Sequence, residues 1–126
     1  MITVNQYGKM SVQLTNGEHS IIADVSKETG GEDEGLNPHE LVEAALGACT
    51  TLTLELYARR KNWDLTNLVV NVKIIKETKE SSVIERTLSF GEQTTPEQRA
   101  RLMEIANKCP IHNLLESNIK VETHEK

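Results

Sequence analysis

The sequence has few aromatic residues: one tryptophan, two tyrosines and one phenylalanine among 126 residues. It also has no surplus of basic residues, because 14 Lys and Arg stand against 19 Asp and Glu, for a formal net charge of −5. Proteins that bind nucleic acids usually carry a basic stripe, and those that bind single strands add aromatic side chains for stacking. Neither feature is present, so we expect no nucleic-acid partner.

Long hydrophobic runs are lacking as well. No apolar run reaches the length of a transmembrane segment, and the first residues, MITVNQYGKMSVQ, lack the charged-then-apolar layout of a signal peptide. We therefore expect a cytoplasmic protein with no membrane partner. Cytoplasmic thiols are kept reduced, so the only two cysteines, Cys49 and Cys109, do not form a structural disulfide framework. They are either inert core residues or a working redox pair.

The order of predicted elements indicates a single α+β domain over residues 1–126. Strands come first, then a long helix, a strand hairpin, more helix and a final strand. The expected segments are strands at 2–6, 10–14 and 19–25, an acidic and mobile loop up to 38, a helix from 38 to about 61, strands at 67–75 and 82–90, a helix that opens at 95–98, a short helix from 110 and a strand at 118–123.

The central helix is the most unusual of these elements. Residues 37–57, NPHELVEAALGACTTLTLELY, place Asn37 as the N-cap and Pro38 at the first helical position. Apolar residues cover every face of the helix, which is typical of a buried helix. A chain of this length has little material to surround it, so we expect a homodimer in which a second copy helps to cover it.

The two cysteines lie in different local settings. Cys109 precedes Pro110, which cannot continue one helix but is well suited to open the next. At that N-cap, free N–H groups and the positive end of the helix dipole would lower the pKa of the Cys109 thiol, whereas the dipole of the preceding helix acts in the opposite sense. Cys49, in the middle of a buried helix, is expected to be inert unless a cation reaches it from elsewhere.

Several other polar residues have two interpretations. Arg86 is in phase with the apolar residues of its strand, and it either reaches solvent at the sheet edge or points inward to serve a site. His39 and His112 are more simply solvated or helix-terminal than catalytic, and Glu43 is most simply a solvent-exposed or interface charge. Only Cys109 and His112 have ligand-like spacing, so we expect no metal centre.

Two motifs carry a resemblance to a known family. NPHELVEAALGACTTLTL, followed sixty residues after Cys49 by CPIHNLL, resembles the OsmC/Ohr family of osmotically induced and organic hydroperoxide resistance proteins. Those proteins carry N-P-x-E-L leading to A-C on a central helix, and a later C-P motif near a helix junction. The resemblance covers essentially the whole chain and is closer to the divergent OsmC-like branch. It implies an intertwined homodimer with active sites near the subunit boundary.

The resemblance also implies a redox cycle. Peroxidase members of the family reduce organic hydroperoxides with a cysteine pair, which would make Cys49 the peroxidatic residue that becomes a sulfenic acid. Cys109 would then resolve it to a disulfide, and an external dithiol, such as a lipoyl group, would restore both thiols. No cofactor is implied. The alternative is a non-catalytic OsmC-like dimer that binds a hydrophobic small molecule in the same apolar pocket.

The family activates its helix cysteine with an arginine paired to a glutamate. In the family that glutamate lies ten residues before the helix cysteine. The corresponding position in this chain is His39, and Glu40 follows it. The family arginine comes from the N-terminal strands, where this chain has none. Lys27 near the N-terminal strands and Arg86 on a later strand are therefore the candidate cations.

Overall fold

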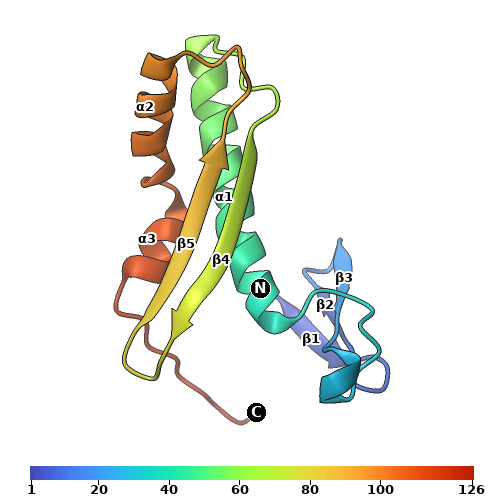
Figure 1. The fold of residues 1–126 in the computed structure, drawn as a ribbon. Coiled ribbons are helices and arrows are strands. Elements are labelled where there is room, and N and C mark those ends of the chain that lie inside the picture. The colour runs from blue at the N-terminus through green and yellow to red at the C-terminus, as the bar shows by residue number, and fades with distance from the viewer. The chain divides into compact units, whose positions relative to one another are not determined.

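The computed structural model describes all residues from 1 to 126, which form two compact units, Met1–Val42 and Glu43–Lys126. The predicted α+β class is confirmed, with two antiparallel sheets and three α-helices (Figure 1). The elements, in chain order, are β1 (Thr3–Gln6), β2 (Val12–Thr15), β3 (Ser20–Ala23), the 3-10 helix η1 (Lys27–Thr29), α1 (Pro38–Lys61), β4 (Val69–Glu77), β5 (Ser82–Ser89), α2 (Pro96–Ala106) and α3 (Pro110–Glu116).

The N-terminal unit is built on a three-stranded antiparallel sheet in the order β1-β2-β3. The tight turn between β2 and β3 lies between the segments 10–14 and 19–25, which the sequence predicts as strands. The Asn16 side chain accepts hydrogen bonds from the backbone N–H groups of Glu18 and His19, and Gly17 has a φ of 102°. Asparagine and glycine suit this turn because one bonds its own backbone and the other adopts positive φ without steric cost.

The acidic segment after β3 is a loop, as the sequence predicts, apart from one short helix. It begins with η1, and it is organised by the buried carboxylate of Asp24. That carboxylate accepts hydrogen bonds from the backbone N–H groups of Val25, Glu32 and Glu34, at 2.7, 3.2 and 3.2 Å. One acidic side chain thus satisfies three backbone donors that no strand or helix pairs.

This arrangement predicts a pH-dependent contribution to stability. Burial raises the pKa of the Asp24 carboxyl, but the three backbone hydrogen bonds outweigh it and hold this pKa below the ordinary value of 3.8. A carboxyl whose folded pKa is depressed stabilises the fold above its unfolded pKa, and the effect is lost as the pH falls through the folded value. Asp24→Asn should therefore lower the thermal unfolding midpoint at neutral pH by several degrees.

The pH series supplies the check on this prediction. The difference in midpoint between the parent and Asp24→Asn should shrink as the pH drops below 3.8. Glu28→Gln, which removes an exposed charge from the same segment, is the matched control and should leave the midpoint unchanged. A difference for Asp24→Asn that stays constant from neutral to acid pH would contradict the assigned role.

The long helix α1 begins and ends where the sequence predicts. The Asn37 side chain accepts a hydrogen bond from the backbone N–H of Glu40, and the Glu40 carboxylate accepts one from the backbone N–H of Asn37. This reciprocal pair confirms Asn37 as the N-cap. Arg59, Arg60 and Lys61 occupy the last turn, where positive charges interact favourably with the helix dipole.

Only one stripe of α1 is buried within the chain, made of residues four apart: Leu46, Thr50, Leu54 and Ala58. Leu52 is 68% exposed and Leu56 53% exposed, so a single chain does not cover every face of the helix, and its burial by a second copy stays a prediction. By length and composition, α1 is also apolar enough to cross a membrane, which corrects the expectation that no run reaches that length. The core helix of a soluble protein meets the same criterion.

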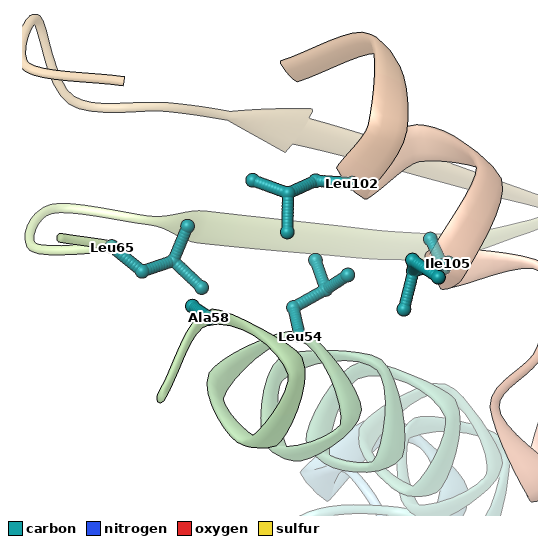
Figure 2. Close-up of a cluster of buried hydrophobic side chains, with 6 residues drawn as sticks. Leu54, Ala58, Leu65, Leu102 and Ile105 are labelled. Atoms are coloured by element: carbon teal, nitrogen blue, oxygen red, sulfur yellow. The ribbon is translucent and has the colours of Figure 1, made fainter. Parts of the chain in front are cut away.

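The main hydrophobic core lies between α1 and α2. Figure 2 shows Leu54 of α1 close to Leu102 and Ile105 of α2, and both Leu54 and Leu102 are fully buried. Leu102, Ile105 and Ala106 form the buried stripe of α2. The helix opens at 95–98, as the sequence predicts, with a capping box in which the Thr95 and Gln98 side chains each accept a hydrogen bond from the other residue's backbone N–H.

The hairpin of β4 and β5 packs against α1. Gly47 faces the hairpin, because a Cβ added at this position would lie in ordinary contact, at 3.4 Å, with a methyl group of Val72. The strand register shifts between Ile74 and Lys76, and the carboxylate of Glu43 accepts a hydrogen bond of 2.8 Å from the Ile74 N–H. Glu43 is therefore a partner of the irregular strand backbone, which corrects its interpretation as a merely exposed charge.

The predicted strand at 118–123 is wrong for the single chain. The segment after α3 has no strand partner, and its apolar residues Ile119 and Val121 are 53% and 83% exposed. A strand forms only where its backbone N–H and C=O groups find a neighbouring strand. The sequence alternates as in a strand, but no neighbouring strand of the same chain pairs with this segment.

Candidate functional site

The site forms around Cys109, at the junction of α2 and α3. Cys109 is the N-cap of α3, as the sequence predicts, and its Sγ accepts a hydrogen bond of 3.3 Å from the backbone N–H of His112. The side chain is fully buried, at 0% exposure. Pro110 at the first helical position produces this geometry, because it ends α2 and opens α3 within a few residues.

A buried threonine of α1 lies next to this thiol. The Thr50 hydroxyl is 2.7 Å from the carbonyl oxygen of Leu46, one helical turn earlier, and 3.8 Å from the Cys109 Sγ. A hydroxyl has only one hydrogen, so it can donate to the carbonyl or to the sulfur, but not fully to both. In the structure it donates to the carbonyl, which leaves the hydroxyl oxygen as an acceptor toward the Cys109 thiol.

Arg86 of β5 connects the site to three elements. Its Nη1 donates to the Thr50 hydroxyl at 3.0 Å, and its Nη2 donates to the Asn107 side-chain oxygen at 3.0 Å. The same Nη2 lies 3.3 Å from His112 Nδ1. Because arginine only donates, Nδ1 must be the acceptor, which places the proton of a neutral His112 on Nε2, 4.0 Å from Glu116. Of the two interpretations of Arg86, the geometry matches the inward one.

These contacts act together on the Cys109 thiol. Burial raises its pKa, but the hydrogen bond from the His112 N–H, the neighbouring Thr50 and Cys49 side chains and the charge of Arg86 lower it. The net effect lowers the pKa of Cys109 below the ordinary value of 9.0. The sequence alone did not predict whether the pKa of Cys109 is raised or lowered, because the dipoles of the two helices act in opposite senses.

Cys49 lies beside Cys109. It precedes Thr50 on α1, it is half-buried, and it is one of the neighbours that lower the pKa of the Cys109 thiol. Both cysteines are free thiols in the structure. The chain therefore brings two thiols, one more accessible and one fully buried, into one site with an arginine. Such a pair can form and break a disulfide.

The predicted site residues separate into two groups. Cys49, Cys109, Arg86 and His112 come together in the C-terminal unit. His39, Glu40 and Lys27 belong to the N-terminal unit, where Lys27 and His39 are exposed. Glu40 serves as a partner in the α1 capping box, which is a structural role.

Sequence reasoning missed two residues of the site. Thr50 carried a signal, because it is the one polar member of an otherwise apolar buried stripe on α1. A polar residue at a buried position needs a partner, and here its partners are functional groups. Asn107, the C-cap of α2, carried no signal that distinguishes it from any other helix end.

Comparison with known proteins connects this geometry to a family. A sequence model described as OsmC-like protein matches residues 31–124. No curated protein is similar enough in sequence to count as a relative.

Among solved structures, an OsmC-like protein from Mycoplasma pneumoniae superposes with a TM-score of 0.78 at 21% identity, over 94% of this chain and 87% of that one. An organic hydroperoxide resistance protein from Elizabethkingia anophelis gives 0.63 at 24% identity, over 95% and 91% of the two chains. A third, OsmC from Legionella pneumophila, described as an organic hydroperoxide resistance protein and predicted redox protein, gives 0.61 at 18% identity, over 94% and 90%. At these identities the likeness establishes the fold.

Proposed function

Since this chain belongs to the OsmC-like protein family, we propose that it reduces organic hydroperoxides through the redox pair Cys49 and Cys109. The observation that carries the proposal is the pair itself. An accessible thiol on α1 lies beside a buried thiol whose pKa is lowered by hydrogen bonds and by Arg86 despite its burial. The names of two similar structures, both organic hydroperoxide resistance proteins, support the same chemistry.

The proposed cycle has three steps. The Cys49 sulfur attacks one peroxide oxygen, the O–O bond breaks, and the alcohol leaves with a proton while Cys49 becomes a sulfenic acid. The Cys109 sulfur then attacks the Cys49 sulfur, and the hydroxyl group leaves as water to give a disulfide. An external dithiol, such as a lipoyl group, finally reduces that disulfide and is itself oxidised. We expect this cycle to run in the cytoplasm, where dithiols are kept reduced.

We further propose that the working form is a homodimer. The exposed side of α1 carries an apolar stripe made of Ala45, Ala48, Leu52 and Leu56, which recur at helical spacing. A contiguous apolar patch on a soluble protein is typical of an interaction site, and small residues let another backbone approach closely. A second copy of this chain is the occupant that the family resemblance implies.

Thiol titration after one equivalent of cumene hydroperoxide tests the peroxidase proposal. The reduced parent should lose both thiols within seconds, because sulfenic acid formation at Cys49 is followed by disulfide formation with Cys109. A Cys49→Ser protein should lose its remaining thiol far more slowly, since Cys109 is fully buried. Adding a dithiol should restore both thiols of the parent.

The opposite result has an equally clear meaning. Thiols that persist for minutes in the parent would contradict the peroxidase proposal. The chain would then be better described as a non-catalytic OsmC-like dimer, and stabilisation against thermal unfolding by an apolar small molecule would be the next measurement.

A further inference from the structure

Arg86 is a half-buried cation that has no carboxylate among its hydrogen-bond partners. Its guanidinium donates to the Thr50 hydroxyl, the Asn107 amide oxygen and the neutral imidazole of His112. The adjacent Glu85 is exposed, on the other face of the strand. A charge that is partly removed from water is costly unless an opposite charge compensates it. The site therefore holds a positive charge that its own partners do not neutralise.

A sulfur that can become anionic lies close to this charge. Arg86 Nη1 is 3.0 Å from the Thr50 oxygen, which is itself 3.8 Å from the Cys109 Sγ. At rest, the Thr50 oxygen is placed to accept the S–H of Cys109, because the hydroxyl gives its own hydrogen to the carbonyl of Leu46. Cys109 is therefore a thiol before turnover, and the charge of Arg86 acts on it when its proton is lost.

That loss belongs to the second step of the proposed cycle. The Cys109 sulfur attacks the sulfur of the oxidised Cys49, an S–S bond forms, the S–O bond breaks, and the Cys109 proton leaves with the hydroxyl group as water. Negative charge develops on the Cys109 sulfur as its S–H bond weakens. A positive charge near an attacking thiol favours the thiolate, which is the nucleophile.

We propose that Asn107 and His112 are positioning residues for this step, because as neutral acceptors they hold Arg86 near the sulfurs without cancelling the charge that assists Cys109 in its attack on the oxidised Cys49. The inference rests on the disulfide cycle of the proposed function and deepens its resolving step. The attack of Cys49 on peroxide comes earlier in the cycle and is not altered by this assignment.

A carboxylate in place of either acceptor would have a different effect. An arginine and a carboxylate at hydrogen-bonding distance have no net charge, so their fields largely cancel at a sulfur a few ångströms away. An amide oxygen accepts the same hydrogen bond without this cancellation. Asn107 is the exposed C-cap of α2, where a carboxylate could also be accommodated, so packing does not impose the neutral side chain.

Competition between dimedone and Cys109 for the same sulfenic acid measures the resolving step alone. The reduced protein receives one equivalent of cumene hydroperoxide in the presence of dimedone. Peptide mass spectrometry then gives the ratio of the dimedone adduct on Cys49 to the Cys49–Cys109 disulfide. Both products come from one intermediate, so the rate at which peroxide reacts cancels from the ratio. The parent should give mostly the disulfide.

Four variants separate the charge of Arg86 from its hydrogen bonds. Asn107→Asp keeps an acceptor but adds a negative charge, so it should raise the fraction trapped by dimedone several-fold, and Arg86→Gln should raise it at least as much. Asn107→Ala removes the hydrogen bond but leaves Arg86 charged and held by two other partners, so its increase should be smaller. Asn71→Asp, the same charge change at an exposed position of β4, should match the parent.

The order of the variants decides the outcome. A trapped fraction for Asn107→Asp no higher than that of the parent would overturn the proposal. So would a larger increase for Asn107→Ala than for Asn107→Asp, because Asn107 would then act only by holding a side chain in place. Thermal unfolding midpoints show which variants are folded. Should Asn107→Asp not fold, a trapped fraction for Arg86→Gln equal to that of the parent would overturn the proposal instead.

Failure here and failure of the proposed function give different results. Diamide adds to the more accessible Cys49 thiol, and attack by Cys109 then breaks the S–N bond, giving the disulfide and a hydrazine that takes up both protons. If peroxide leaves the thiols intact but Asn107→Asp slows this closure, the peroxidase proposal fails and the role of Arg86 holds. If peroxide forms the disulfide with equal trapping in every variant, the peroxidase proposal holds and the role of Arg86 fails.

Discussion

In a Cys109→Ser protein, organic hydroperoxide is expected to leave a sulfenic acid on Cys49 that no disulfide replaces. The parent should convert nearly all of its molecules to the Cys49–Cys109 disulfide, and the variant none, because the other thiol of the site is absent. A sulfenic acid without a resolving thiol persists or is oxidised further to a sulfinic acid. Dimedone labelling followed by peptide mass spectrometry measures the trapped species on Cys49.

Serine is a conservative replacement at this position. Its oxygen can accept the N-cap hydrogen bond that the backbone N–H of His112 gives to the sulfur, so the start of α3 should be retained. Cys49→Ser is the matched control, and it should show no dimedone adduct. Rapid loss of the Cys49 thiol in Cys109→Ser that leaves neither a dimedone adduct nor a sulfinic acid on Cys49 would contradict the sulfenic acid route, as would no thiol loss at all.

Most local structure could be predicted because its signals are local. Pro38 after Asn37 predicts the start of α1, and Thr95 with Gln98 predicts the capping box of α2. Pro110 predicts the helix junction that places Cys109 at an N-cap. Each of these depends on hydrogen bonds between residues close in sequence, so the residue types themselves identify the structure.

The geometry of the site could be predicted only in part. Strand alternation places Arg86 on the half-buried face of the hairpin, and there the sequence leaves two interpretations. Its three partners come from α1, from the end of α2 and from α3, at sequence separations of 36, 21 and 26 residues. No periodicity specifies which helix end will lie opposite a given strand position, because this depends on packing of the whole unit.

Two expectations that a single chain does not fulfil share a physical origin. A pattern of apolar residues predicts that a face will be covered, but it does not identify the covering element. Both the exposed stripe of α1 and the unpaired segment at 118–123 have such patterns without an occupant in the chain. A second copy of the chain would supply one, as the proposed homodimer implies.

Substitutions at two leucines of α1 test the stability of one chain separately from its association with another. Leu54 is 0% exposed and packs against the core residues Leu102 and Ala58, whereas Leu52 is 68% exposed. Leu54→Ala should lower the free energy of unfolding by about 2–5 kcal/mol, the usual cost of such a cavity in a core. This loss should not depend on protein concentration, because the contacts lie within one chain.

Leu52→Ala makes the same chemical change on the other side of the same helix. In an isolated chain it should alter stability by no more than about 0.5 kcal/mol, as exposed substitutions usually do. In a dimer that buries the Leu52 stripe, it should weaken association by about 1.5–3 kcal/mol, the worth of burying one such side chain. Unfolding of the parent should then become more difficult as the protein concentration rises, since only folded chains associate.

Urea unfolding at low and high protein concentration, together with sedimentation analysis, distinguishes these cases. The parent should sediment as a dimer, Leu54→Ala should remain a dimer of lower stability, and Leu52→Ala should dissociate at a higher concentration than the parent. A parent whose unfolding midpoint is the same at every concentration, with a neutral Leu52→Ala, would show that this face of α1 stays in contact with water. The apolar residues along it would then need a different explanation from association between copies.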